Sequence, residues 1–153
     1  MDIIRRNTDY ALRAMLNLTG NYGSGAVPTG HIALQEDIAY QLTCKLMQRL
    51  QKAKLVKSRM GPTGGFELAR KPSEINLLQI IEAIQGPVSL NRCLLSRNSC
   101  PRSNKCAITG KLMQLQTNIE DSLEKITLNQ LVSAKAGKPK RGPKAGRGKG
   151  KIK

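Results

Sequence analysis

Apolar residues recur every three or four positions along much of the chain, which is the period of an amphipathic helix. The spacing predicts a first helix over residues 8–19, capped by Thr8, and a second, shorter helix that opens at Thr29. A third helix is predicted over residues 40–53, and its inward face is formed by leucines at every fourth position: Leu42, Leu46 and Leu50. The first third of the chain is therefore expected to be mostly helical.

The pattern changes after the third helix. Residues 55–60 and 66–68 predict two short strands, joined by a glycine-rich loop over residues 61–65 whose glycines permit positive φ. Ser73 is expected to begin another helix, which continues through Ile84 and stops at the following Gly-Pro pair.

The C-terminal part contains an irregular segment, a long helix and a polar tail. Three cysteines and little periodicity mark the irregular segment. Apolar residues from 108 to 132 again step by three and four, which predicts a long helix that packs on its symmetry mate: Leu112, Leu115, Ile119, Leu123 and Ile126. The Lys-, Gly- and Pro-rich tail is expected to be disordered. The predicted divisions are a domain over residues 1–90, a cysteine loop over 91–107, a dimerisation helix over 108–133 and a basic tail over 134–153.

This order of elements is typical of a winged helix-turn-helix: a mainly α fold with a small β wing, here followed by a long C-terminal dimerisation helix. In that fold the second helix of the pair enters the major groove of DNA, while the hairpin touches phosphates or the minor groove. The candidate DNA contacts are polar positions of the third helix and residues of the hairpin: Tyr40, Gln41, Cys44, Lys45, Gln48, Arg59, Gly61, Pro62, Thr63 and Gly64. The alternative is a small helical domain with a solvated basic face.

Charge favours the DNA interpretation. The formal net charge is +16, from 26 Lys and Arg against 10 Asp and Glu. Nine of the basic residues lie in 135–153, which contains no acid, so the rest of the chain still carries +7. Such an excess points to a polyanion partner, which can be DNA, RNA or an anionic membrane surface, and the predicted winged helix-turn-helix favours double-stranded DNA. No apolar run approaches the roughly 18 residues that span a bilayer, and the N-terminus lacks the order of a signal peptide, so we expect a cytoplasmic protein without membrane contact.

Three cysteines are spaced as Cys93-x6-Cys100-x5-Cys106, among arginines and lysines that lower thiol pKa values. Zinc usually takes four protein ligands, often in CxxC pairs, whereas this chain has no such pair and one histidine, His31, in the helix-turn-helix. An iron–sulfur cluster with three cysteines and a different fourth ligand fits better. Three unligated thiols, two of them able to pair as a disulfide, are the alternative.

Several segments together resemble the Rrf2 family of winged-helix regulators, which includes IscR, NsrR and RirA. The matching segments are residues 8–14, 46–50, 61–66 and 81–88, the last leading into Cys93. The resemblance covers about residues 1–132. It implies a homodimer with a long crossing helix and binding to a palindromic operator that an iron–sulfur cluster modulates.

Two departures bear on the cluster. The first cysteine gap is six residues, where five is common in the family, and Thr109 stands near the position of the histidine ligand of IscR-like members. NsrR-like members instead use an aspartate at the start of the first helix, donated by the other subunit, and Asp9 matches it. The alternative for Asp9 is an acid favoured by the helix dipole. A 4Fe–4S cluster is favoured, and 2Fe–2S stays possible.

We expect a transcriptional regulator, and a repressor in preference to an activator. Its cluster is expected to sense iron, redox state, nitric oxide or iron–sulfur status. A cluster-free regulator of the same fold that responds to thiol oxidation or a protein partner is the alternative. A metabolic iron–sulfur enzyme or electron carrier is disfavoured, since the chain has no nucleotide-binding motif and no acid–base constellation. Cys44 is interpreted as a small DNA contact and not as a cluster ligand.

Overall fold

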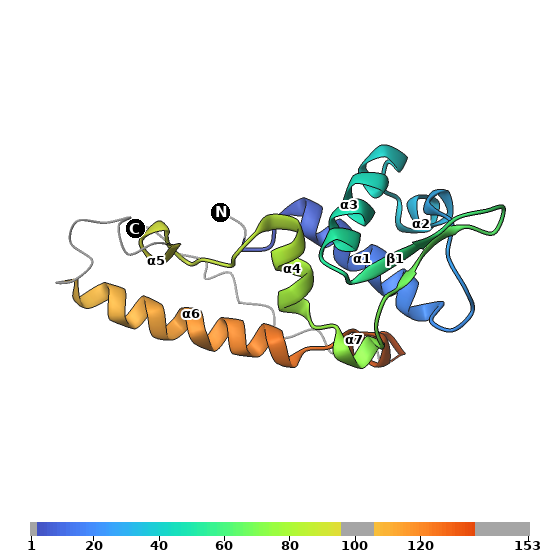
Figure 1. Cartoon of the computed structure of the whole chain (residues 1–153). Coiled ribbons are helices and arrows are strands. Elements are labelled where there is room, and N and C mark those ends of the chain that lie inside the picture. Colours follow the sequence, from blue (N-terminus) through green and yellow to red (C-terminus); the bar gives the residue numbers. More distant parts are fainter. Residues whose placement is uncertain (1–2, 96–105, 137–153) are drawn as a thin grey trace, which may run out of the picture.

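A computed structural model of the chain describes residues 3–95 and 106–136 (Figure 1). Its elements are α1 (Arg6–Gly20), α2 (Thr29–Glu36), α3 (Tyr40–Lys52), β1 (Val56–Arg59), β2 (Gly65–Leu68), the 3-10 turn η1 (Pro72–Glu74), α4 (Leu77–Gln85), α5 (Arg92–Leu95), α6 (Ala107–Lys125) and α7 (Leu128–Ala136). The predicted mainly α fold with a small antiparallel hairpin is confirmed. Cys100 and the basic tail beyond residue 136 lie outside the described residues.

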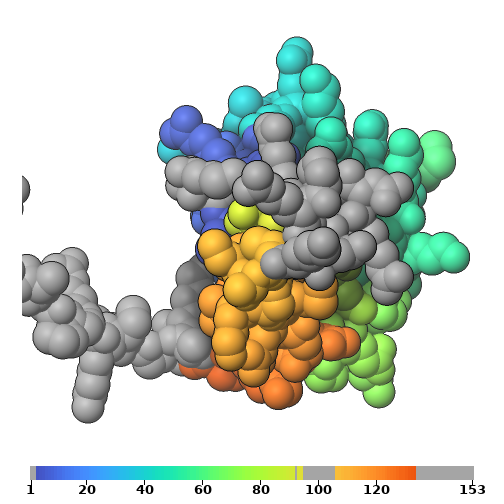
Figure 2. Space-filling model, turned by 90° about the vertical axis from the view of Figure 1, so that its left-hand side faces the viewer, coloured from blue at the N-terminus to red at the C-terminus, as the bar shows by residue number. Residues whose placement is uncertain are grey.

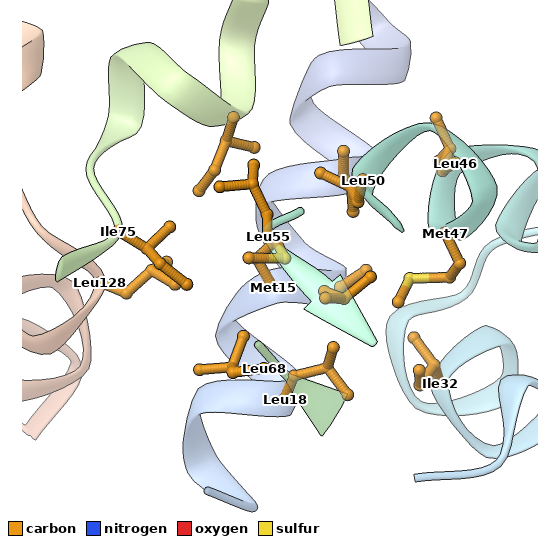
Figure 3. Close-up of a cluster of buried hydrophobic side chains, with 14 of the residues drawn as sticks. Met15, Leu18, Ile32, Leu46, Met47, Leu50, Leu55, Leu68, Ile75 and Leu128 are labelled. Atoms are coloured by element: carbon orange, nitrogen blue, oxygen red, sulfur yellow. The ribbon is translucent and has the colours of Figure 1, made fainter. Parts of the chain in front are cut away.

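The core lies where α1, α3, α4 and the hairpin meet (Figure 3). It is built from aliphatic side chains and methionine, as expected of a chain with 3% aromatic residues. Leu46 and Leu50 of α3 are buried as predicted, whereas Leu42 is only half-buried. Met47 and Thr43 are also fully buried, so the inward face of α3 is wider than the four-residue leucine repeat suggested.

The hairpin, called the wing below, is locked to the α1–α2 loop. β1 and β2 pair antiparallel from Val56 opposite Leu68 to Arg59 opposite Gly65. Val27 adds a bridge to Phe66, with backbone N–H to O distances of 2.8 and 2.9 Å. Gly65 has φ +153°, and a Cβ there would lie 2.1 Å from the Val27 carbonyl oxygen. The wing thus depends on glycine at this position.

Gly65→Ala is therefore expected to lower the free energy of unfolding by about 2–3 kcal/mol, because relief of the clash requires loss of the Val27–Phe66 bridge. Thermal or urea unfolding monitored by circular dichroism measures the change. Gly20→Ala is the matched control, since a Cβ there meets nothing within 4 Å. Equal stabilities of the two variants would contradict the described approach of β2 to Val27.

Two predicted helix starts are wrong. α1 begins at Arg6, and Thr8 is a buried residue inside it whose hydroxyl donates to Gln85 Oε1 at 2.7 Å, so it does not cap the helix. Ser73 lies in the 3-10 turn η1, and α4 begins only at Leu77. Asn76 is the cap of α4: its side chain accepts from the Gln79 N–H at 3.0 Å, and the Gln79 side chain accepts from the Asn76 N–H at 3.3 Å.

The predicted single long helix is two helices. α6 ends at Lys125, and the chain then pairs with the segment before α4: Leu77 N–H donates to Ile126 O at 2.9 Å, and Leu128 N–H donates to Ile75 O at 3.0 Å. Leu128 is fully buried in the core, and α7 packs on α1. The exchange of backbone bonds at 126–128 therefore ends the long helix and returns the chain to the domain. None of the helices within the described ranges is long and apolar enough to cross a membrane.

Candidate nucleic-acid interface and cysteine segment

α3 presents one continuous polar face. Gln41, Lys45 and Gln48 are exposed and Cys44 is half-exposed, while the opposite face of the helix is buried. α2 packs against α3, and the turn between them uses Asp37 in the left-handed region at φ 53°. Figure 1 places α2, α3 and the wing at the end of the molecule away from the start of α6. The structure thus brings the predicted groove-facing side chains together on an accessible helix.

The orientation of α3 is fixed at its last turn. Arg49 donates from Nη1 to the carbonyl oxygen of Ile84, in the last turn of α4, at 2.9 Å. At the first turn, Tyr40 is exposed and lies four residues before Cys44 on the same side. Hydrogen bonding with Cys44 raises the pKa of the Tyr40 phenol.

The cations of the wing lie on β1, where Arg59 is the last residue before the turn. Lys57 Nζ and Arg59 Nε lie 3.2 and 3.1 Å from the same carboxylate oxygen of Glu67, and the hydrogen bond from Lys57 is the main reason that the pKa of Glu67 is lowered. Arg59, predicted as an anchor for DNA, is thus held by Glu67 with 64% of its side chain exposed. Glu67 is not among the site residues predicted from the sequence, because its position opposite Lys57 depends on the hairpin register.

The predicted wing contacts divide into exposed and structural residues. Gly61, Pro62 and Thr63 are exposed. Gly64 is half-buried, and a Cβ there would lie 2.6 Å from the Arg59 carbonyl oxygen, so glycine at this position closes the turn. The turn itself is held by a hydrogen bond from Gly64 N–H to Gly61 O at 2.9 Å.

Two of the three predicted cluster cysteines lie on elements that contact each other. Cys93 is in α5, and Cys106 precedes the first residue of α6, and both are half-exposed. The hydroxyl and the N–H of Thr109, followed by the N–H of Ile108, lower the pKa of the Cys106 thiol. Thr109, which cannot replace a histidine ligand, thus favours the thiolate of its neighbour. Two partly exposed thiols, of which Cys106 has a favoured thiolate, are donors that suit a soft metal centre.

Asp9 stands apart from these thiols within one chain. It lies in the first turn of α1 with 63% of its side chain exposed, 3.6 Å from Arg13 Nε. Asp9, Cys93 and Cys106 do not form a metal-binding group in the described part of a single chain.

Two glutamines that the sequence analysis did not single out hold the segment between α4 and Cys93. Gln85 accepts hydrogen bonds from the Arg5 N–H and from Thr8, and it donates to the Ile3 carbonyl. Gln116 of α6 is buried, accepts from the Leu90 N–H at 2.9 Å and donates to the Val88 carbonyl. The segment that leads into α5 is therefore fixed at both ends by side-chain amides. A polar residue among the apolar positions of α6 was the only sequence signal.

α6 leaves an apolar stripe uncovered along its length. Figure 2, turned toward the end where α6 begins, shows this helix in orange at the surface. Ile108 and Leu115 are 66% and 52% exposed, and Leu112 and Ile119, which complete the stripe at helical spacing, are half-buried.

Residues 4–134 match the model of a protein family described as Rrf2, an iron-dependent transcriptional regulator. The HTH-type transcriptional regulator IscR of Pectobacterium atrosepticum is 34% identical over 126 residues, which cover 82% of this chain and 76% of the relative. The IscR of Escherichia coli O1:K1 / APEC is 32% identical over 124 residues, covering 81% and 76%.

Solved structures agree with this match. The structure of T. potens IscR superposes with a TM-score of 0.70 at 26% identity, covering 91% of this chain and 93% of the other. The structure of CymR, described as the global cysteine regulator of B. subtilis, superposes with a TM-score of 0.71 at 25% identity, covering 88% and 98%.

Proposed function

This chain belongs to the Rrf2 family of transcriptional regulators, and from that premise we propose that it is a homodimeric repressor whose operator affinity depends on an iron–sulfur cluster. The observation that carries the proposal is the placement of Cys93 in α5 and of Cys106 directly before α6, two helices that contact each other, with both thiols half-exposed and the pKa of Cys106 lowered. Metabolic chemistry is set aside because the relatives are transcriptional regulators and not enzymes. A protein that binds bacterial promoters acts in the cytoplasm.

The cluster would be held by Cys93, Cys100 and Cys106, with Asp9 of the partner subunit as the fourth ligand. The exposed carboxylate of Asp9 at the start of α1 is accessible to a second subunit, which supports this assignment. A 4Fe–4S cluster is favoured over 2Fe–2S. When bound, such a cluster would supply the reactive group that oxygen or nitric oxide modifies and that is lost when iron is short.

The residues of this chain provide a route from the cysteine segment to the DNA helix. Gln116 holds Val88 and Leu90 just before α5, and Gln85, which accepts from the Thr8 hydroxyl, holds the start of the same segment to α1. Ile84, next to Gln85, receives the hydrogen bond from Arg49 of α3. A shift of the segment before Cys93 would therefore change the support of α3, which is the element proposed to read DNA.

We assign base reading to the exposed face of α3 and backbone contacts to the wing. Gln41, Cys44, Lys45 and Gln48 have the donors and acceptors that suit base edges in the major groove, with Tyr40 at the start of the same face. A two-fold dimer would place two α3 helices in successive major grooves of a palindromic operator. The basic tail would add affinity without sequence preference.

A second candidate is a regulator that reads thiol oxidation without a cluster. It is favoured by the lowered pKa of Cys106, since the thiolate is the form that oxidants attack. One structural neighbour, 25% identical, is CymR of Staphylococcus aureus in an oxidised form. Purification without oxygen distinguishes the two candidate functions. Brown protein that contains iron and sulfide supports the cluster. Colourless protein that binds the operator, and that loses operator binding on oxidation, supports the thiol sensor.

Gln41→Ala tests the DNA assignment. The operator is first selected from genomic fragments, and binding is then measured by fluorescence anisotropy on operator and scrambled duplexes at several salt concentrations. Loss of one base contact per subunit is expected to cost about 1–3 kcal/mol on the operator and to relax preference at one position of each half-site, with little change on scrambled DNA.

Gln114→Ala is the matched control, because Gln114 is an exposed glutamine of α6 far along the chain from α3. Equal weakening of both duplexes by Gln41→Ala would mean that α3 contacts phosphates and reads no base. Identical operator affinity of cluster-loaded and cluster-free protein would reject the proposed dependence on the cluster.

A further inference from the structure

The tip of the wing carries an apolar side chain in full contact with solvent. Met60, the first residue after β1, is 97% exposed, the highest value among the large hydrophobic side chains of the described residues. Pro62, two residues later, is exposed as well. Single exposed apolar residues are common on protein surfaces, so exposure alone assigns no role.

The turn that follows Met60 is closed by a backbone hydrogen bond and requires glycine at two positions. Gly61 has φ +109°, and the turn is closed by the hydrogen bond from Gly64 N–H to Gly61 O at 2.9 Å. Gly64 and Gly65 leave no room for a Cβ, since one would meet backbone atoms at 2.6 and 2.1 Å. Met60 is therefore presented on a preorganised support, which lowers the entropy lost when the side chain is inserted into a partner.

The tip holds no cation of its own. Residues 60–64 carry no charge, and the nearest cations, Lys57 and Arg59, both bind one oxygen of Glu67 at 3.2 and 3.1 Å. Attraction to phosphates therefore acts along β1 as far as Arg59, while the turn itself offers van der Waals contact. Methionine is one of the side chains with which proteins wedge apart base steps in the minor groove of DNA.

We propose that Met60 is a minor-groove wedge. This proposal rests on the proposed operator binding. The wing of each subunit inserts the Met60 side chain at a pyrimidine–purine step that flanks the half-site, and it bends the duplex there. The protein thereby prefers operators that deform easily at this step, although no hydrogen bond reads the bases there. TA and CA steps are the ones that open most easily, so the preference arises from the cost of deforming stiffer sequence.

The test uses the full chain and the selected operator with a donor and an acceptor dye at its ends. Two duplexes are compared, one with a TA step under the wing and one with a stiff AA step. Wild-type protein is expected to bend the first duplex and to prefer it by about tenfold. Met60→Gln, which keeps the length but adds an amide, is expected to lose the bend and the preference, whereas Met60→Leu retains both.

Met113→Gln is the matched control, since it makes the same change at a 56% exposed methionine of α6. Equal bending and preference in wild-type protein and Met60→Gln overturn the wedge while leaving operator binding intact. A wild-type protein that prefers the operator without bending it also overturns the wedge alone. Failure of the wild-type protein to distinguish operator from scrambled DNA overturns the proposed function and the wedge together.

Discussion

Cys106→Ala is expected to remove the iron and the visible absorbance from protein purified without oxygen. Only Cys93 and Cys100 would remain as thiolate ligands, and the lost ligand is the one whose thiolate the first turn of α6 favours. The same loss is expected for Cys93→Ala and Cys100→Ala. Iron and sulfide analysis with an absorption spectrum measures the effect, and operator binding of each variant should match that of the cluster-free wild type.

Cys44→Ala is the control for this series, because Cys44 lies on the exposed face of α3 and is expected to leave the cluster intact. Asp9→Ala is expected to keep the iron but to change the spectrum or the rate of reaction with oxygen and nitric oxide. Full iron content in all three single cysteine variants would refute the ligand assignment and favour the thiol sensor.

The parts of the fold that could be predicted from sequence are those set by local spacing. The glycine-rich turn of the wing, the start of α2 and the extent of α3 depend on residues within a few positions of one another, and the structure has them as predicted. The leucine repeat of α3 is confirmed at Leu46 and Leu50, whereas Leu42 is only half-buried. The family resemblance, which rests on several such segments, is confirmed by the family match over residues 4–134.

The errors arise where distant parts of the chain decide local structure. Local spacing predicts Thr8 as a cap, but its hydroxyl donates to Gln85, 77 residues away. The long C-terminal helix has no proline at its break, and it ends because Thr127 bridges to Asn76. A pattern along one segment carries no information about such a partner.

Only part of the candidate site could be predicted from the sequence. The accessible face of α3 follows from amphipathic spacing alone, and Gln41, Lys45 and Gln48 lie on it. The clamp of Glu67 on Lys57 and Arg59 depends on hairpin register, and the hold of Gln116 on Val88 and Leu90 depends on how α6 packs. The role of Asp9 needs a second subunit, so it stays a prediction from family resemblance.

Leu115→Glu is expected to convert the dimer into monomers and to weaken operator binding on the order of 100-fold or more. Leu115 is 52% exposed in a single subunit, in the stripe of α6 that also contains Ile108, Leu112 and Ile119. A carboxylate there is solvated in the monomer but would be buried without a partner in an interface between two α6 helices, which is costly. The loss of affinity follows because a monomer binds one half-site and forfeits the second, linked contact.

Thr117→Glu separates the interface from the charge itself. Thr117 is exposed and lies two residues beyond Leu115, which turns it about 200° around the helix, so the same carboxylate would face solvent in the dimer. Sedimentation or light scattering reports the mass, circular dichroism reports the fold, and anisotropy reports operator binding. A Leu115→Glu variant that stays dimeric with wild-type affinity would show that the subunits associate through another surface. A folded, monomeric Leu115→Glu variant beside a dimeric Thr117→Glu variant would place the two-fold contact on this stripe. The spacing of the two α3 helices in the dimer would then be determined by α6.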